Sequence, residues 1–206
     1  MVGFGGVMGV NKAIQSVRIP QIVEAAVEII AEKGIKETTL DAVAKKAGLS
    51  KGGLIHYFPT KKALIETVVK EFFSRIFQRG KEIRDSFSDP YEQLISFVWL
   101  YDRDDPDYFN GYRMFFEIMT VASMNEEYRQ VFHQWVNGWV ELLKASVEKG
   151  VKKGDFKVED SEEAAKTISA IYQGVASRWF LDPENHSDRW AKNTVKNLIK
   201  FVVSKK

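Results

Sequence analysis

The chain has 206 residues, 45% of them hydrophobic, so it is long and apolar enough to bury a core, and disorder is not expected. It contains no cysteine, which excludes disulfides, thiolate metal sites and a cysteine nucleophile. The formal net charge is only +2, but residues 1–62 carry nine lysines and arginines against five acidic residues. The basic excess therefore lies in the N-terminal segment, as in a nucleic-acid-binding module joined to a neutral body.

No targeting or membrane signal is visible in the sequence. No apolar run approaches the roughly 18 residues of a membrane span. The N-terminus lacks the charged start and apolar block of a signal peptide. We therefore expect a cytoplasmic protein with no membrane partner.

Residues 1–17 contain four glycines and no helical period. We expect either a flexible arm or residues carried over from expression. From Ile19 onward, apolar residues recur at helical spacing, Pro20 suits a first helical turn, and Gly34 stands where the helix would end. This pattern predicts a first helix over 19–33.

Two short helices and one long helix follow. Thr38 and Thr39 are candidate N-caps, and Asp41 is placed to complete a capping box with Thr38. Ser50 caps a third short segment. Thr60 caps a long helix that runs toward Arg84.

The rest of the chain also has helical patterns, and no alternating run indicates a sheet. The expected segments are 91–103, 107–122, 125–150, 161–181 and 188–204. The class is therefore all-α, with about nine helices. We divide the chain into an arm (1–17), a three-helix domain that contains a helix-turn-helix (18–65) and a helical body (66–206).

Lysines occupy the starts of two predicted helices. Lys51 opens the third helix, and Lys61 and Lys62 open the fourth. Cations at a helix N-terminus oppose the macrodipole by about 0.3–1 kcal/mol each. A bound phosphate would make a lysine favourable at these positions, because the free backbone N–H groups there also bind anions.

Two adjacent glycines lie in the third helix. Gly52 and Gly53 each destabilise a helix by about 1 kcal/mol relative to alanine, so helix propensity does not explain them. Close approach of a ligand to the backbone would explain them, because glycine has no side chain in the way. Leu54 and Phe58 would anchor this helix while Ile55 and His56 face outward into a major groove. Spacing alone leaves open a small helical subdomain with a solvated basic face.

These residues also resemble a known family. The run Thr38-Thr39-Leu40-Asp41-Ala42-Val43-Ala44, then Ala47-Gly48-Leu49-Ser50-Lys51-Gly52-Gly53-Leu54, then His56-Tyr57-Phe58-Pro59-Thr60-Lys61-Lys62-Ala63-Leu64 is similar to the TetR/AcrR regulator signature. The resemblance covers Ile19 to Val69, about a quarter of the chain. It is specific because the helix-turn-helix is followed directly by an aromatic-Phe-x-x-Lys motif, here Tyr57 to Lys61.

The resemblance implies a DNA-binding head, a ligand-binding body, and a dimer formed by the last two helices. It implies that Thr38 or Thr39, together with Lys61, holds phosphates, and that the third helix is the recognition helix. Ile55 departs from the tyrosine common at its position, which leaves base preference open. The expected DNA-binding residues are Thr38, Thr39, Ser50, Lys51, Gly52, Gly53, Ile55, His56, Tyr57 and Lys61.

Residues 99–139 are rich in aromatic side chains, most of which any helical fold would use as core. A pocket needs such walls and a few polar groups. The resemblance implies that this region surrounds an effector, hydrophobic or amphipathic in character, that changes the separation of two DNA-binding heads. The candidate effector residues are Trp99, Arg103, Phe109, Tyr112, Arg113, Phe116, Glu117, Trp135, Trp139 and Tyr172.

Two apolar stripes lie near the C-terminus. One runs from Ala164 to Trp179 and the other from Trp190 to Val202. Periodicity alone allows each stripe to be buried within its own subunit. Because of the resemblance, we favour a four-helix interface in a homodimer.

An enzyme is not expected, and neither a cofactor nor a metal is implied. The histidines His56, His133 and His186 are scattered, with no second ligand at metal spacing. The acidic run 102–107 lacks the spacing of a calcium loop and contains Pro106, so we interpret it as a solvated turn.

The alternative function is a helical small-molecule-binding protein without specific DNA binding. Lysines at helix N-termini argue against it, since such a protein has no use for them. A salt titration separates the two, because phosphate-driven binding weakens steeply with salt.

Overall fold

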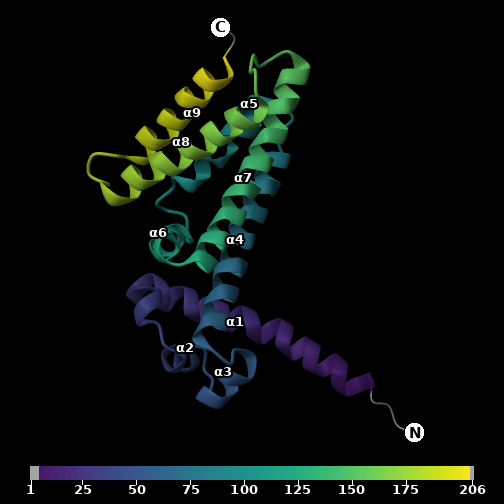
Figure 1. Cartoon of the computed structure of the whole chain (residues 1–206), viewed down its shortest axis with the longest axis vertical. Helices are drawn as coiled ribbons and strands as arrows, with labels where there is room; N and C mark the ends of the chain where they lie inside the picture. Colours follow the sequence, from purple (N-terminus) through teal and green to yellow (C-terminus); the bar gives the residue numbers. More distant parts are fainter. Residues whose placement is uncertain (1–4, 205–206) are drawn as a thin grey trace. The chain divides into compact units, whose positions relative to one another are not determined.

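The computed structural model describes residues 5–204, with side chains from residue 17 onward, and every regular element in this range is helical (Figure 1). The elements are α1 (Gly5–Glu37), α2 (Leu40–Lys46), α3 (Lys51–Tyr57), α4 (Lys61–Asp85), α5 (Pro90–Ile95), the 3₁₀ helix η1 (Ser96–Leu100), α6 (Tyr108–Met124), α7 (Glu126–Lys153), α8 (Ser161–Leu181) and α9 (Asp188–Val203). The predicted all-α class is confirmed.

The described chain packs into two compact units. Unit 1 contains the residues up to Ser74 together with Arg113–Thr120, and unit 2 contains Arg75–Tyr112 and the residues from Val121 onward. Helices α4 and α6 therefore each contribute to both units. The predicted domain boundaries after residues 17 and 65 stay predictions.

Several helix ends lie where the sequence predicted them. The Ser50 hydroxyl accepts a hydrogen bond from the Gly53 N–H at 3.0 Å, and the Thr60 hydroxyl accepts one from Ala63 N–H at 3.1 Å. Gly34 interrupts α1 with φ 83° and ψ 163°. Gly154 ends α7 in the left-handed conformation with φ 78°, so this helix runs to Lys153, three residues beyond the predicted end at 150. These ends depend on local chemistry, which is why sequence reasoning found them.

Helix α1 starts earlier than predicted. It begins at Gly5, so residues 5–17 are helical where an arm without helical structure was expected, and residues 1–4 lie outside the described range. Pro20 stands inside the helix rather than in its first turn. Extending an existing helix avoids the nucleation cost, so weak helix formers before residue 18 are not enough to stop it.

The cap of α2 also differs from the prediction. Thr39, not Thr38, is the N-cap, and its hydroxyl accepts a hydrogen bond from the Ala42 N–H at 3.2 Å. The capping box between Thr38 and Asp41 is therefore wrong. The Thr38 hydroxyl instead donates to the Gly34 carbonyl at 2.8 Å, which ties the end of α1 to the start of α2.

The predicted helix over 91–103 is shorter and divided. Helix α5 passes into η1, which ends at Leu100, and Tyr101 leaves the helical region with φ −102° and ψ 56°. After that point aspartate side chains take backbone N–H groups that a helix would use. The Asp102 carboxylate accepts a hydrogen bond from the Asp104 N–H, and the Asp105 carboxylate accepts one from the Asp107 N–H.

The core of unit 1 joins α1, α3, α4 and the middle of α6. Its fully buried side chains include Ile22, Ala26, Ile30, Leu54, Leu64, Ile65, Val68, Met114 and Ile118. Each large apolar side chain in this set contributes about 1.5–3 kcal/mol through burial. This core fixes α3 against the unit and leaves its opposite face for binding.

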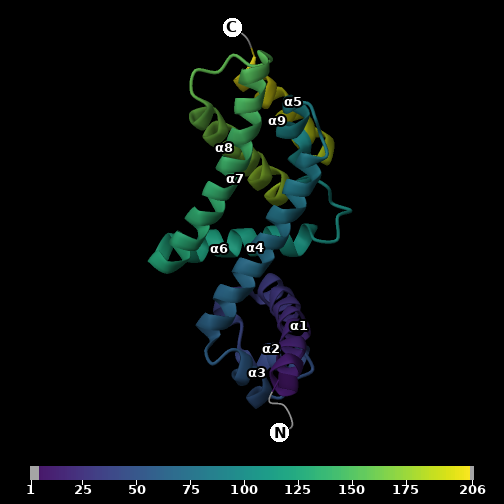
Figure 2. The ribbon, with the colours of Figure 1, turned by 90° about the vertical axis from the view of Figure 1, so that its right-hand side faces the viewer.

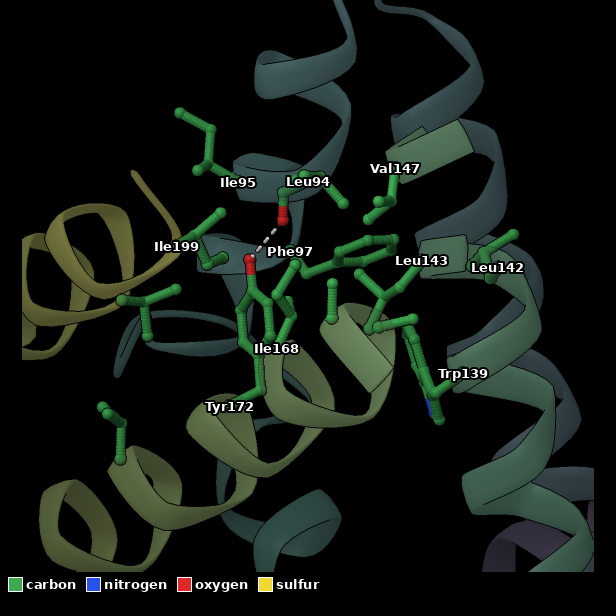
Figure 3. Packing of buried hydrophobic residues seen from close by; sticks show 14 of the residues in the cluster. Leu94, Ile95, Phe97, Trp139, Leu142, Leu143, Val147, Ile168, Tyr172 and Ile199 are labelled. Carbon is green, nitrogen blue, oxygen red and sulfur yellow. Dashed lines mark hydrogen bonds between the residues drawn. The ribbon is translucent and has the colours of Figure 1, made fainter. Parts of the chain in front are cut away.

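The core of unit 2 lies among α5, η1, α7, α8 and α9. Helix α8 packs between α7 and α9, which lie beside it in both views (Figures 1 and 2). Tyr172 of α8 points toward α5, where its hydroxyl donates to the Leu94 carbonyl at 2.8 Å (Figure 3). Phe97 and Trp139 pack beside it with ring centroids 5.0 Å apart.

The two C-terminal stripes have different surroundings. In α8 the residues of the predicted stripe are buried inside unit 2, including Ala165, Ile168 and Trp179 at 0% exposure. In α9 the stripe contains Leu198 and Phe201, which are 42% and 81% exposed. The resemblance favoured a four-helix dimer interface for both stripes, whereas the α8 stripe is part of the subunit core.

Candidate DNA interface and effector region

Helices α2 and α3 form a helix-turn-helix held by buried apolar side chains. Val43 and Ala44 of α2 and Leu54 of α3 are at most 2% exposed. Gly48 makes the turn with φ 67°, a conformation that favours glycine. The Leu49 N–H donates to the Ala44 carbonyl at 2.9 Å and closes the turn.

One face of α3 is left exposed. Lys51, Gly52, Ile55 and His56 are exposed, and a Cβ added to Gly52 would meet no atom within 4 Å. Tyr57 is half-buried, with its ring 5.5 Å from that of His56. The residues predicted for recognition therefore lie together on the surface of one short helix.

The two candidate threonines are not equivalent. Thr38 is fully buried and uses its hydroxyl on the Gly34 carbonyl, so the prediction that its side chain contacts DNA is wrong. Thr39 is exposed at the start of α2, where its hydroxyl caps the helix. Of the two, only Thr39 is placed to reach a phosphate.

The lysines at helix starts have protein partners in the structure. Lys51 Nζ lies 3.1 Å from Asp41 Oδ2, and Lys61 Nζ donates to the Lys36 carbonyl at 2.7 Å. The ion pair is exposed, and such pairs contribute about 0–1 kcal/mol. Exchanging Asp41 for a phosphate is therefore inexpensive for Lys51.

The candidate effector residues divide between the two units. Arg113, Phe116 and Glu117 belong to unit 1, and Glu117 Oε2 accepts a hydrogen bond from the Ile35 N–H at 2.8 Å. The other seven belong to unit 2, which contains Trp99, Arg103, Phe109, Tyr112, Trp135, Trp139 and Tyr172. Phe109 is 50% exposed, so its side chain is not part of a closed core.

Unit 2 brings most of these aromatic side chains into two clusters. The Trp139 cluster consists of Phe77, Phe97, Trp135 and Trp139. The Trp179 cluster consists of Tyr101, Tyr108, Tyr112, Trp179 and Phe180. Tyr172 joins them, since its ring lies 6.0 Å from that of Phe97 and 6.2 Å from that of Tyr101. Burial raises the pKa of the Tyr172, Tyr101 and Tyr112 hydroxyls, which stay neutral.

Two buried indole groups lack a hydrogen-bond acceptor. The Nε1 atoms of Trp99 and Trp139 have no partner among the described residues, although Trp139 is only 8% exposed. A buried donor without an acceptor costs about 1–3 kcal/mol. Such donors are suited to a ligand that carries an acceptor.

Arg103 is held by several groups of unit 2. Its guanidinium pairs with the Asp188 carboxylate, donates to the carbonyls of Trp179 and His186, and lies 4.7 Å from the Trp179 ring. Burial alone would raise the pKa of Asp188, but hydrogen bonds from Trp179 and Arg103 hold this pKa below its usual value. The structure thus shows Arg103 joining the segment after η1 to the α8–α9 connection.

We expect Asp188 to make unit 2 sensitive to acid. Its pKa is lower in the folded state than the usual value of about 3.9, so its contribution to stability is present above that pH and is lost as pH falls through the folded value. Urea unfolding from pH 7 to pH 3 should give a smaller acid loss for Asp188→Asn than for the wild type. Equal acid losses in both proteins would contradict this assignment. Asp105 and Asp160 also have lowered pKa values, so part of the loss should remain.

Sequence reasoning missed a charged group beside Trp99. Arg79 of α4 lies over the Trp99 ring, 4.0 Å from its centroid, and pairs with Asp105 in the acidic run. Arg75 lies 3.5 Å from Asp107 of the same run. The acidic run is therefore paired with α4 rather than fully solvated. A hint was available in the sequence, because Arg75 and Arg79 are four residues apart and so share a helix face.

Within residues 5–204 no cluster of three histidine or acidic side chains is arranged to hold a metal ion. None of the helices in that range is both long and apolar enough to cross a membrane.

The comparisons with known proteins decide the family. Residues 22–68 match the model of bacterial regulatory proteins of the tetR family, and residues 102–202 match the C-terminal model of the BetI-type transcriptional repressor. The chain belongs to the TetR family. It is a DNA-binding regulator of transcription, and the first of these matches contains the helix-turn-helix of unit 1.

Curated relatives of this TetR-family chain are regulators. The transcriptional repressor KstR2 of Rhodococcus jostii is 25% identical over 81% of this chain and 81% of its own length. KstR2 of Mycolicibacterium smegmatis is 32% identical, but the match spans only 37% of this chain and 38% of that repressor. The fatty acid metabolism regulator protein of Bacillus subtilis is 23% identical over 87% of this chain and 92% of its own length.

Solved structures share the fold. A protein from Saccharomonospora viridis, described as a transcriptional regulator in complex with choline, has a TM-score of 0.83 at 20% identity. That comparison covers 93% of this chain and all of the other. A TetR-family regulator from Rhodococcus has a TM-score of 0.78 at 22% identity, covering 92% of this chain and all of the other. Both likenesses concern the fold alone.

Proposed function

We propose that this protein is a cytoplasmic repressor that binds a near-palindromic operator as a homodimer and is released by a small hydrophobic or amphipathic effector. The observation that carries the proposal is the exposed face of α3, where Lys51, Gly52, Ile55 and His56 lie together above a buried anchor, Leu54. A helix presented in this way fits the major groove.

Each residue at the proposed interface has a role that its position allows. Ile55, His56 and Tyr57 face the bases, while Gly52 and Gly53 allow the backbone of α3 to come close to the DNA. The polar groups at the starts of α2, α3 and α4 contact phosphates, and these are Thr39, Ser50, Lys51 and Lys61.

The dimer is proposed to use the outer faces of α8 and α9. Leu181 is 67% exposed and Phe201 is 81% exposed, whereas Val195 and Ile199 on the other side of α9 are buried. Pairing two copies across these faces covers apolar surface that a single chain leaves open to water.

The effector is proposed to bind among the aromatic side chains of unit 2. The unpartnered indole N–H groups of Trp99 and Trp139 are the donors for an acceptor on the effector. Aromatic faces also bind quaternary ammonium groups. Choline is therefore the first compound to test, because the structural neighbour from Saccharomonospora viridis was solved with it. A fatty acyl compound is the second, given the name of the Bacillus subtilis relative.

The test is a titration of the protein against duplexes from the DNA that flanks its own gene, followed by fluorescence anisotropy at two salt concentrations. We expect one near-palindromic duplex to bind two chains with an affinity that falls steeply with salt. Lys61→Ala should reduce the slope of log affinity against log salt by about 0.9, because one phosphate contact is lost. Lys152→Ala is the matched control, since Lys152 is exposed in α7 and carries the same charge.

Failure of this test has a definite meaning. If no flanking duplex binds specifically at either salt concentration while the chain remains folded, the repressor proposal is wrong. A helical small-molecule-binding protein without specific DNA binding is then the better description.

A further inference from the structure

The segment 34–38, which comprises the end of α1 from its break at Gly34 and Thr38 just beyond it, is held by hydrogen bonds from three places in unit 1. We call it the hinge segment. Glu117 Oε2 of α6 accepts from the Ile35 N–H at 2.8 Å. Lys61 Nζ at the start of α4 donates to the Lys36 carbonyl at 2.7 Å. Thr38 closes the segment on itself through the Gly34 carbonyl. The path from α1 to the helix-turn-helix is thus fixed by side chains remote in sequence.

The backbone at Gly34 explains why the Ile35 N–H needs an outside acceptor. Gly34 has φ 83° and ψ 163°, a combination that only glycine adopts readily, and it breaks the helical path. Ile35 is only 6% exposed, so water is a poor substitute for a partner. The Glu117 carboxylate supplies the acceptor, and hydrogen bonds to a charged oxygen are stronger than neutral ones.

The carboxylate also packs directly on Gly34. A Cβ at Gly34 would lie 3.0 Å from Glu117 Oε2 and 3.2 Å from the carboxyl carbon, which is closer than nearly all real contacts of such atoms. Carboxylates are disfavoured by about 0.3–1 kcal/mol at the C-terminal end of a helix such as the main part of α1. Local electrostatics therefore do not account for an acidic residue here, whereas the hydrogen bond to Ile35 does.

Helix α6 connects this contact to the rest of the protein. Residues Arg113–Thr120 of α6 belong to unit 1, whereas Tyr112 and Val121 on either side belong to unit 2. Met114 and Ile118 are fully buried, so the middle of α6 is fixed within unit 1. Tyr112 donates its hydroxyl to the Leu100 carbonyl at 2.9 Å in unit 2. One continuous helix thus carries both the Tyr112 contact and the Glu117 contact.

We propose that Glu117 is a positioning residue whose carboxylate holds the hinge segment and thereby sets the orientation of α2 and α3 for DNA. A shift of α6 along or about its axis changes this hydrogen bond first. The inference rests on the proposed function, because it concerns binding to the operator. It gives Glu117 a role in the DNA-binding unit instead of a direct effector contact.

Two substitutions separate the reach of the side chain from its charge. Glu117→Gln removes the charge but keeps an oxygen at the same distance. Glu117→Asp keeps the charge but is one methylene shorter and does not reach Ile35. Glu71→Gln is the matched control for charge, because Glu71 is an exposed acidic residue of α4 in unit 1.

The measurements are operator affinity by anisotropy, the melting temperature, and hydrogen–deuterium exchange of peptides covering residues 34–38. We expect Glu117→Asp to weaken operator binding about tenfold and to speed exchange of the Ile35 amide, with little change elsewhere. Glu117→Gln should stay within about threefold of Glu71→Gln in affinity and should retain slow exchange.

Three outcomes overturn the proposal. One is wild-type affinity and wild-type exchange in Glu117→Asp. Another is an equal loss of affinity in Glu117→Gln and Glu117→Asp, because the variant that keeps an oxygen within reach of the Ile35 N–H should bind more tightly than the one that does not. The third is faster exchange throughout α2 and α4 in Glu117→Asp, because the residue would then only hold the fold together. If the wild type binds no specific duplex, the proposed function fails, while the exchange measurement still reports on the hydrogen bond to Ile35.

Discussion

Replacing Gly52 with alanine is expected to stabilise the isolated protein and to weaken its binding to the operator. In the structure a Cβ at Gly52 would meet no atom within 4 Å, so alanine fits without strain. Alanine favours a helix over glycine by about 1 kcal/mol, and the melting temperature should rise accordingly. On DNA the added methyl group lies between the α3 backbone and the groove, so we expect operator affinity to fall about tenfold or more.

Opposite signs in the two measurements make this prediction specific. Differential scanning calorimetry gives the stability change, and anisotropy with the operator duplex gives the affinity. Gly138→Ala in α7 is the control, because a Cβ there makes an ordinary contact with the Phe77 ring at 3.5 Å and the site lies in unit 2. If Gly52→Ala binds the operator as tightly as the wild type, close backbone approach is not the reason for this glycine.

The helix-turn-helix could be located from the sequence because its signals are local. Ser50 caps α3 through an N–H three residues away, and Thr60 caps α4 in the same way. Gly34 and Gly48 both have positive φ, and each stands where one helix gives way to the next. Interactions within three or four residues leave a pattern that can be seen in one sequence.

The roles of Glu117 and Arg103 could not be predicted, because their partners are far away in the chain. Glu117 and Ile35 are 82 residues apart, and Arg103 and Asp188 are 85 apart. In the sequence both residues stand among aromatic side chains, which suggested polar groups of an effector site. One sequence contains no signal for such pairings, so a side chain fixed on the protein resembles one that awaits a ligand.

The α8 stripe shows a related limit. Ile168 and Trp179 are fully buried within unit 2, although their spacing equally suits a surface that pairs with a second copy. In α9 the helical period places Val195 and Ile199 inside, while Leu198 and Phe201 remain exposed. Periodicity identifies an apolar face, but only packing shows whether the same chain covers it.

Replacing Trp179 with alanine is expected to cause the largest loss of stability among single changes in unit 2. Trp179 is fully buried, with its ring 5.5 Å from that of Tyr101 and 5.1 Å from those of Tyr108 and Tyr112. Its indole N–H also donates to Asp188 at 2.9 Å. Removing a buried tryptophan leaves a large cavity, so the free energy of unfolding should fall by about 3–5 kcal/mol.

A second variant divides this loss between packing and hydrogen bonding. Trp179→Phe keeps an aromatic ring but loses the donor to Asp188, and we expect a loss of about 1–2 kcal/mol from the missing hydrogen bond and the smaller ring. Met124→Ala is the control, because Met124 is 86% exposed and its truncation should change stability by less than about 0.5 kcal/mol.

Urea unfolding at one fixed protein concentration, followed by circular dichroism and by tryptophan fluorescence, measures all three variants. A fixed concentration is needed because unfolding of a dimer depends on it. A loss below about 1 kcal/mol in Trp179→Ala would contradict the assignment of Trp179 to the core. Because Tyr112 packs on Trp179 and lies in the same helix as Glu117, a destabilised Trp179 cluster should also speed exchange of the hinge segment. Normal exchange there, in a protein that has lost several kcal/mol, would show that unit 1 holds α6 without help from unit 2.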